Sequence, residues 1–468
     1  MKKRDFLKIA GLSGIGVTSS VEILVAGSHR EPLVKVRKQE FNMSGYAAPK
    51  IDNVRIGYIG LGNRGAGAIK RMVHIENVQI KGVADILPEK ANSAKQQLEQ
   101  SGHRPDVYSG SADAWKKLCD RDDIDLIYIC TPWDLHAPMA IYAMEQGKHV
   151  AVEIPAALTV DECWKLVEIS EKTKKHCMML ENCCYDFFEL LTLNMARQGF
   201  FGEIVHAEGA YIHDIFDSLF QKDKRFELWR LKENLRNGNL YPTHGLGPVA
   251  QVLDINRGDK MDYLVSMSSN DFMLQARAKE LAEKDPYFKQ YTDKSFRGNM
   301  NTTTIRTSKG RTIMLQHDVS SPRPYSRLHT ISGTKGAAQK YPLSEDGSQG
   351  RISQGHEWLK ASEFKELEAK YQPEIVKRVG ELAKKVGGHG GMDFLMDWRL
   401  IDCLRNGLPL DQDVYDAASW SVIAPLSEWS VAHRSNSIDI PDFTNGAWKK
   451  NRQVDITLKG GGNTGVKS

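Results

Sequence analysis

The sequence predicts an α/β protein of two domains, the first built on a parallel sheet and the second an α+β domain with a largely antiparallel open sheet. Apolar runs alternate with helical patterns over residues 51–185, as in strand–helix–strand units. Beyond about residue 190, strand-like runs follow one another with loops between them. A chain of 468 residues also exceeds the roughly 250–300 residues at which a single hydrophobic core stops growing.

The first domain is predicted to consist of apolar strands with helices between them. Strands are predicted at residues 54–60, 78–85, 123–132 and 148–155. Helical patterns lie between them at 67–75, 88–102 and 136–147, and the last two end at glycine. A further helix and strand are predicted at 158–176 and 176–183. Because a helix joins each strand to the next, we expect a parallel sheet with helices on both faces.

The second domain, predicted over residues 186–450, contains strand-like runs. They occupy residues 202–214, 261–270, 302–319 and 327–342, and the turn at Lys309-Gly310 divides the third into a hairpin. Helical patterns follow at 363–385, 392–407 and 415–435, the first of them charged enough to face solvent. Residues 29–50 predict a linker and residues 451–468 a tail, whose glycine-containing part 458–468 is expected to be mobile.

Charge and cysteine usage exclude several classes of protein. The net charge is +4, and residues 1–28 carry half of it, so the remaining chain has no electrostatic footprint for nucleic acid. The seven cysteines are odd in number and include no C-x-x-C pair, so neither a disulfide framework nor a zinc site is expected. No carboxylate–histidine cluster has the spacing of metal ligands, and we predict no metal.

A glycine-rich loop joins the first strand to the first helix. Gly60, Gly62 and Gly65 form the pattern G-x-G-x-x-G of a Rossmann dinucleotide-binding domain. The first glycine allows the tight turn, the second lets the pyrophosphate approach the backbone, and the third permits close packing of helix on strand. Asp85 ends the second strand, where it can accept hydrogen bonds from the adenosine ribose. A carboxylate there repels a 2′-phosphate, which favours NAD over NADP; the alternative role of Asp85 is a helix cap before Pro88.

Residues 1–28 predict a signal peptide that is removed, because a basic start precedes a short apolar run and small residues near Ala26. The sequence "KRDFLK" is similar to the twin-arginine export motif, with Lys3-Arg4 in place of two arginines. An ordinary secretory signal is the alternative. Glu22 interrupts the apolar run, so no integral membrane span is expected. Since the twin-arginine pathway carries folded proteins, the chain would reach the periplasm or the medium with NAD already bound.

Three clusters carry candidate chemistry. "CTPWDLH" places Trp133 and His136 at the carboxyl end of the third strand, where ligands collect, although His136 could instead cap the next helix. "VEIP" ends the fourth strand, so Glu153 is expected near the nicotinamide, with a plain salt bridge as its alternative. In "NGNLYPTHGLGP", Tyr241 and His244 face one way and can hold a sugar hydroxyl and move its proton.

These segments resemble glycoside hydrolase family 109, the NAD-dependent α-N-acetylgalactosaminidases, within the glucose-fructose oxidoreductase/inositol dehydrogenase superfamily. The resemblance covers residues 50–450 and rests on "GLGNRGAG", "CTPWDLH", "LENCCYDFFELLTLNMARQGFFGE", "AEGAYIHD", "YPTHGLGP", "QHDVSSPRPYSR" and "GGMDFLMDW". By position it implies that NAD contacts Asn63, Arg64, Asp85, Trp133, Asp134, Leu135, His136, Glu153, Ile154 and Asn182. It implies that the sugar contacts Tyr211, Arg230, Tyr241, Pro242, Thr243, His244 and Tyr325.

One departure from the superfamily bears on the catalytic base. Its sugar dehydrogenases carry Glu-Lys-Pro where this chain has Glu153-Ile154-Pro155, and that lysine helps to take the hydroxyl proton. Isoleucine cannot titrate, and the later aspartate–histidine pair of the superfamily is missing from the "YPTHGLGP" region in its usual form. Another base must serve. The candidate catalytic residues are His244, which is favoured, Tyr241 and Tyr185.

The resemblance implies a hydrolysis without net redox change. NAD takes a hydride from carbon 3 of terminal α-N-acetylgalactosamine, and the ketone acidifies the proton on carbon 2. The carbon 1 substituent leaves by elimination, water adds, and the hydride returns. Two alternatives stay open: an exported sugar oxidoreductase with tightly bound NAD(P), and a non-catalytic sugar-binding protein that retains NAD. The open sheet of the second domain could pair with another copy, so a homo-oligomer is expected.

Overall fold

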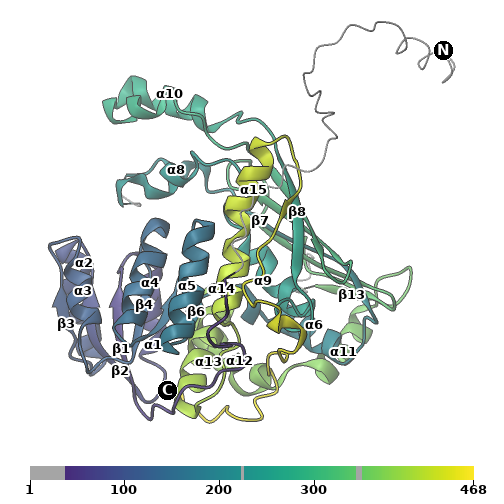
Figure 1. Ribbon diagram of the computed structural model, residues 1–468, viewed down its shortest axis with the longest axis horizontal. Helices are drawn as coiled ribbons and strands as arrows, with labels where there is room; N and C mark the ends of the chain where they lie inside the picture. The colour runs from purple at the N-terminus through teal and green to yellow at the C-terminus, as the bar shows by residue number, and fades with distance from the viewer. Residues whose placement is uncertain (1–36, 223–225, 344–349, 468) are drawn as a thin grey trace, which may run out of the picture. The chain divides into compact units, whose positions relative to one another are not determined.

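Six strands of the first domain form one parallel sheet in the order β3-β2-β1-β4-β5-β6 (Figure 1). The computed structural model describes residues 37–222, 226–343 and 350–467, so the predicted signal peptide lies outside the described residues. The strands are β1 (Val54–Ile59), β2 (Val78–Ala84), β3 (Asp106–Tyr108), β4 (Leu126–Ile129), β5 (His149–Val152) and β6 (Cys177–Met179). This order is that of a Rossmann fold, which confirms the predicted fold class.

The helices of this domain begin at identifiable signals. They are α1 (Asn63–Met72), α2 (Pro88–Gln100), α3 (Ala114–Cys119), α4 (His136–Glu145) and α5 (Val160–Thr173). α5 begins with a capping box, in which Thr159 accepts from the Glu162 N–H and Glu162 accepts from the Thr159 N–H. α2 has Pro88 in its first turn, where the missing N–H costs nothing. The sequence did not predict β3 and α3, which are too short to show a clear period.

The second domain has an eight-stranded sheet in the order β13-β12-β11-β7-β10-β9-β8-β14. Its strands are β7 (Ile204–Ile212), β8 (Met261–Ser268), β9 (Asn301–Thr307), β10 (Thr312–Asp318), β11 (Ser326–Gly333), β12 (Ala337–Gln339), β13 (Arg351–Ser353) and β14 (Ile438–Asp439). β7 and β10 run parallel, and the other neighbouring pairs are antiparallel. The predicted hairpin is β9–β10, whose turn includes Gly310 at φ +82°.

Prolines break two helices that the sequence predicted as continuous. Beyond residue 185 the chain contains α6 (Phe187–Arg197), α7 (Phe216–Leu219), α8 (Trp229–Glu233), α9 (Thr243–Val252), α10 (Leu274–Lys284), α11 (Ala361–Tyr371), α12 (Glu374–Val386), α13 (Met392–Asn406), α14 (Val414–Ser421) and α15 (Ile423–Ala432). Pro373 separates α11 from α12, and Pro425 follows the break between α14 and α15. A proline ring clashes with the preceding turn and supplies no N–H, so the predictions of single helices were wrong at these points.

Two helices from the second half of the chain complete the packing of the first sheet. α13 packs against α1 and β1, and α14 packs against α5 and β6. The Tyr128 hydroxyl of β4 donates to Asp397 of α13 at 2.8 Å, and Arg71 of α1 donates to the same carboxylate at 2.8 Å. The core of the first sheet is therefore built from residues that lie more than 200 positions apart in the chain.

The described segments 37–50 and 451–467 lie against the folded domains. In the first of them, Gln39 and the Met43 N–H both donate to the Tyr415 hydroxyl. In the second, the Thr464 carbonyl accepts from the Trp398 indole at 3.0 Å, and the Lys467 N–H donates to the His74 carbonyl at 2.7 Å. These contacts join the described part of the tail to the domains, and its mobility stays a prediction.

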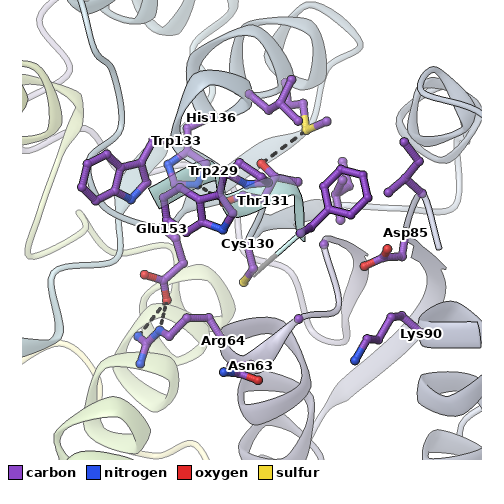
Figure 2. A pocket seen from close by; sticks show the side chains of 18 of the residues that line it. Asn63, Arg64, Asp85, Lys90, Cys130, Thr131, Trp133, His136, Glu153 and Trp229 are labelled. Carbon is purple, nitrogen blue, oxygen red and sulfur yellow. Dashed lines mark hydrogen bonds and ion pairs between the residues drawn. The ribbon is translucent and has the colours of Figure 1, made fainter. Parts of the chain in front are cut away.

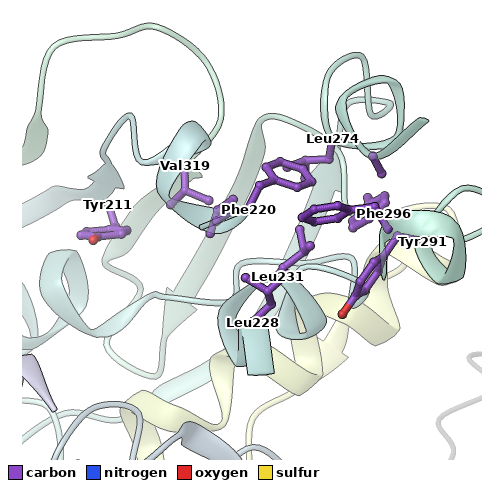
Figure 3. Packing of buried hydrophobic residues seen from close by; sticks show 11 residues of the cluster. Tyr211, Phe220, Leu228, Leu231, Leu274, Tyr291, Phe296 and Val319 are labelled. Atoms are coloured by element: carbon purple, nitrogen blue, oxygen red, sulfur yellow. The ribbon is translucent and has the colours of Figure 1, made fainter. Parts of the chain in front are cut away.

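A separate apolar cluster packs beside β7 in the second domain (Figure 3). Its members are Tyr211, Leu219, Phe220, Leu228, Leu231, Leu274, Ala278, Phe288, Tyr291, Phe296 and Val319. Tyr211 lies at one end of the cluster, apart from most of its members. Within the described ranges, no helix combines the length and the apolarity that crossing a membrane requires.

Candidate active site

The glycine-rich loop has the geometry that each of its glycines predicts. Gly60 has φ +87°, and a Cβ there would lie 2.6 Å from the Cys130 carbonyl oxygen. A Cβ on Gly65 would lie 1.9 Å from the Gly60 carbonyl oxygen, so helix α1 can approach the loop only through a glycine. A Cβ on Gly62 would meet nothing within 4 Å. The open space at Gly62 is therefore where a phosphate group can approach the backbone.

The start of α1 is suited to an anion. Gly62 is its N-cap and supplies no side chain, and the first turn contains no acidic residue, so the free N–H groups and the helix dipole favour negative charge there. Asp85 accepts hydrogen bonds from the Leu61 N–H at 2.6 Å and the Leu87 N–H at 2.9 Å. These bonds leave lone pairs for ribose hydroxyls. The carboxylate thus both orders the loop and lies at the predicted ribose position.

A cavity of about 760 Å³ joins this loop to the second domain (Figure 2). Among the predicted residues it is lined by Gly60, Gly62, Asn63, Arg64, Asp85, Trp133, Leu135, His136, Glu153, Ile154, Asn182, Tyr211, Arg230, Tyr241 and His244. Glu153 and Arg64 form an ion pair below Trp133 and Trp229, and Asp85 and Lys90 lie at the other end. The fold therefore brings predicted cofactor and sugar residues into one space.

Arg64 is held between two carboxylates. Its Nε lies 2.7 Å from Glu153 and its Nη1 lies 3.1 Å from Asp393, so the predicted salt bridge of Glu153 is present at the cavity wall. Asp393 also accepts from the Asn182 amide. Because both carboxylates balance the guanidinium, Arg64 fixes the wall of the cavity and carries little free charge toward it.

Asp393 and His389 are site residues that the sequence analysis missed. The His389 ring lines the cavity and its Nδ1 lies 2.9 Å from Asp393. Burial alone would raise the pKa of Asp393, but the hydrogen bond from His389 and the charges of Arg64 and Arg71 hold it well below its ordinary value. The motif "GGMDFLMDW" includes Asp393, yet nothing local indicates that it meets a helix more than 300 residues earlier.

Glu181 is the hydrogen-bond partner of His244, and it could not be predicted from the sequence. Its Oε1 lies 2.7 Å from His244 Nδ1, and its side chain is completely buried. Burial alone would raise the pKa of Glu181, but the charge of His244 and its hydrogen bond lower it, so the carboxylate is ionised. A carboxylate–histidine pair is therefore present, with its acid at the end of β6. The prediction that such a pair is missing held only for the "YPTHGLGP" region.

Aromatic rings surround Arg230 at the sugar end of the cavity. Its Cζ lies 5.5 Å from the Trp133 ring centre, 5.1 Å from that of Tyr241 and 5.9 Å from that of Tyr211. Its Nη2 donates to the Tyr211 hydroxyl at 3.4 Å. Tyr325 does not line the cavity but lies beside it, with its ring centre 6.4 Å from that of Tyr211. The geometry keeps an arginine rigid while its other donors stay free for a polar ligand.

The His136 ring lies inside the protein, between two backbone carbonyl groups. The ring is fully buried, with Nδ1 2.7 Å from the Pro155 carbonyl oxygen and Nε2 2.8 Å from that of Thr131. It therefore links the loops after β4 and β5, and its predicted contact with NAD stays a prediction. The neighbouring Asp134 is exposed and does not line the cavity.

Tyr185 is a correction to the candidate catalytic residues. It is buried, donates to Asp411 at 3.2 Å and does not line the cavity. Burial raises its pKa well above the ordinary value, so the phenol keeps its proton and is a poor base near neutral pH. Pro242 and Thr243 also lie outside the lining and begin α9, which positions His244.

One cluster has the residue types of a metal site. The ligating atoms of Glu181, Cys183 and His244 lie within 4.8 Å of one another. However, Glu181 already accepts from the imidazole and from the Cys183 N–H, and burial raises the pKa of the Cys183 thiol. We therefore assign the cluster to the Glu181–His244 pair, and the absence of a metal stays a prediction.

Comparison with known families agrees with this division of the chain. The family described as "Glycosyl hydrolase 109, C-terminal domain" matches residues 185–450, which is more than half of the chain. The chain belongs to glycosyl hydrolase family 109. The family described as "Oxidoreductase family, NAD-binding Rossmann fold" matches residues 54–181, and NAD is the cofactor of the first domain. The resemblance and the cofactor predicted from the sequence are confirmed.

Two relatives from Bacteroides fragilis are similar to this family 109 member over most of their length. "Glycosyl hydrolase family 109 protein 1" is 50% identical over 420 residues, covering 87% of this chain and 88% of the relative. "Alpha-N-acetylgalactosaminidase" is 51% identical over 416 residues, covering 87% of this chain and 95% of the relative.

Solved structures share the fold of this family 109 member at low identity. A levoglucosan dehydrogenase in complex with NADH has a TM-score of 0.60 and 18% identity, and the match covers 83% of this chain and 100% of that chain. An aldose-aldose oxidoreductase from Caulobacter crescentus has a TM-score of 0.58 and 16% identity, with the same coverage.

Proposed function

We propose that this protein hydrolyses terminal α-N-acetylgalactosaminides with NAD as a resident cofactor and with no net oxidation or reduction. The observation that carries the proposal is one cavity in which the cofactor loop at Gly62 meets Arg230, Tyr241 and His244. The relative named alpha-N-acetylgalactosaminidase, at 51% identity, supports this sugar.

The residues around the cavity fit NAD. Gly62 leaves space at the uncapped start of α1, Asp85 lies at the ribose position, and the wall formed by Glu153 completes the groove. When bound, NAD supplies a reversible acceptor for a hydride from carbon 3 of the sugar. The protein must bind and orient the sugar and move its protons.

His244 is the base that the geometry favours. Ionised Glu181 accepts from Nδ1, so Nε2 is the ring nitrogen left to exchange a proton with the sugar. Tyr241 has a different role, because burial raises its pKa well above the ordinary value. A phenol that keeps its proton can donate a hydrogen bond to the sugar but cannot serve as a base near neutral pH.

We further propose that the chain is exported through its twin-arginine-type signal to the periplasm or the medium. A reaction that returns its hydride in each turnover needs no supply of nicotinamide cofactor, which supports this location. For the expected homo-oligomer, we propose the open face of the second sheet, where Tyr263, Val265 and Met267 are partly or largely exposed on β8.

Release of nitrophenol from p-nitrophenyl α-N-acetylgalactosaminide tests the proposal. We expect release by the purified protein without added NAD, and NAD in the supernatant after denaturation. In the His244→Ala variant we expect kcat to fall about 10²- to 10⁴-fold with bound NAD retained, because the variant lacks only the base. Accumulation of oxidised sugar without release would indicate the oxidoreductase instead. Near-normal turnover of the variant would contradict the role of His244.

A further inference from the structure

A second histidine meets the cavity through a tyrosine. The Tyr211 hydroxyl lies 2.9 Å from His213 Nδ1 and 3.4 Å from Arg230 Nη2. A guanidinium can only donate, so the phenol oxygen accepts from Arg230, and with the imidazole proton of His213 on Nε2 the phenol proton is directed to Nδ1. This arrangement makes Nδ1 of His213 the acceptor and leaves a lone pair of the phenol oxygen for a ligand.

Tyr211 and His213 lie beside the cavity and do not belong to the Glu181–His244 pair. Tyr211 lines the cavity, whereas His213, one residue beyond the end of β7, lies behind it. The ring centre of Tyr211 is 5.3 Å from that of His244 and 4.2 Å from that of Tyr241. Tyr211 is buried at the edge of the apolar cluster (Figure 3), and its ring contacts those of Tyr241 and His213, so the hydroxyl has a fixed direction. His213 is partly exposed, so a proton that reaches it can exchange with solvent.

The proposed reaction removes two protons from the sugar, one from a hydroxyl and one from carbon 2. A single base cannot hold both at once. His244 with Glu181 accepts one, and the structure removes Tyr185 and Tyr241 as acceptors for the other. Of the aromatic hydroxyls that line the cavity in the described chain, Tyr211 has an imidazole nitrogen within hydrogen-bond distance.

We propose that Tyr211 and His213 form the second proton acceptor of the site, which rests on the proposed glycosidase function. Of the hydroxyl O–H bond and the carbon 2 C–H bond, the one whose proton His244 does not accept breaks, and that proton bonds to the Tyr211 oxygen. The phenol proton bonds at the same time to His213 Nδ1, and the electron pair stays on the sugar. The proton returns by the reverse path when water adds. Tyr211 touches the substrate, and His213 is a positioning residue that acts through it.

The surroundings of His213 keep its imidazole unprotonated before the reaction. The charged and titratable groups that face it are Arg230, His244, Asp214 and His389. Burial lowers the pKa of His213, as do the charges of Arg230, His244 and His389, while Asp214 opposes them. The imidazole is therefore neutral near pH 7 and Nδ1 has a free lone pair.

The test compares His213→Ala with His213→Asn, using p-nitrophenyl α-N-acetylgalactosaminide and measuring kcat, KM and bound NAD. The asparagine Oδ1 can replace Nδ1 as a hydrogen-bond acceptor, but it cannot take the proton. We expect kcat to fall about 10²-fold in both variants, while KM in His213→Asn stays within about threefold of wild type and NAD stays bound. His206→Asn, at a histidine within β7 that is bonded to Thr312, is the matched control and should match wild type.

A kcat of His213→Asn near the wild-type value would overturn the proposal, because His213 would then only orient Tyr211. Wild-type kcat in His213→Ala would overturn it as well. If His213→Ala does not fold, the His213→Asn comparison decides alone. A wild-type protein that releases no nitrophenol would instead contradict the proposed function. In that case nitrogen NMR of the sugar-free protein still tests the hydrogen bond, because the His213 Nδ1 signal should shift in Tyr211→Phe.

Discussion

Glu181 and His244 lie 63 residues apart in the chain and 2.7 Å apart in the fold. The sequence identified His244, because a tyrosine and a histidine three residues apart on a helix start have a local pattern. It could not identify Glu181, whose role depends on where β6 ends relative to α9. The same reason explains why Asp393 and His213 were missed and why Tyr185 was chosen wrongly: its direction is set by Asp411, 226 residues later.

At this scale the Glu181→Gln variant tests the pair. A neutral amide cannot hold the His244 proton on Nδ1 as the carboxylate does, so Nε2 loses its role as base. We expect kcat to fall about 10²- to 10⁴-fold with unchanged NAD content, measured with the nitrophenyl substrate. Glu208→Gln is the control, because Glu208 lies 3.6 Å from His206 in an acid–histidine pair outside the cavity. Equal activity in both variants would show that the Glu181–His244 pair does not take part in catalysis.

Among the elements, strands and the glycine-rich loop were the most predictable. Buried runs and G-x-G-x-x-G have local physical causes, and each glycine has the role that its position indicates. Helix ends were less predictable, because Pro373 and Pro425 break patterns whose apolar period continues through them. The three-residue strand β3 shows no period at all.

The loop–helix junction gives a prediction at this scale. In Gly65→Ala the new Cβ would lie 1.9 Å from the Gly60 carbonyl oxygen, so α1 must move away from the loop. We expect less bound NAD and a free energy of unfolding lower by about 1–3 kcal/mol. In Gly67→Ala the nearest atom would be Nη1 of Arg71 at 3.4 Å, an ordinary van der Waals contact, so NAD content should not change and stability should rise by up to about 1 kcal/mol. Urea unfolding and NAD content measure both. Equal NAD loss in the two variants would rule out this steric account.

At the scale of the molecule, the sequence predicted two domains and their fold class, but not how they share residues. α13 and α14 were predicted as helices, and only the structure shows that they pack on the first sheet. Their apolar faces would fit any sheet equally well, and the contacts that select this one are buried polar groups. Arg71 and Tyr128 meet Asp397, although no period in the sequence links these positions.

Asp397→Ala tests this connection. The substitution leaves Arg71 with one weaker partner, Asp393 at 3.4 Å, and leaves the buried Tyr128 hydroxyl without its acceptor. We expect the free energy of unfolding to fall by about 3 kcal/mol, measured in urea. Glu381→Ala, which removes an exposed pair with Lys384, should change it by less than about 1 kcal/mol. A loss no larger than in the control would mean that these contacts do not join the two halves.

The packing of α13 and α14 also decides which parts of this protein can be exchanged with those of a relative. A chimera with its junction between β6 and α6 would combine Arg71 and Tyr128 of one parent with Asp397 of the other. Such a junction lies at the domain boundary in the sequence, but it separates residues that pack together in the core of the first sheet. The residues that build this core form a discontinuous unit, 54–181 together with 392–421, and the second segment also packs against α12 and α9. Recombination among family members that respects this unit would preserve the cofactor half, whatever sugar the other half binds.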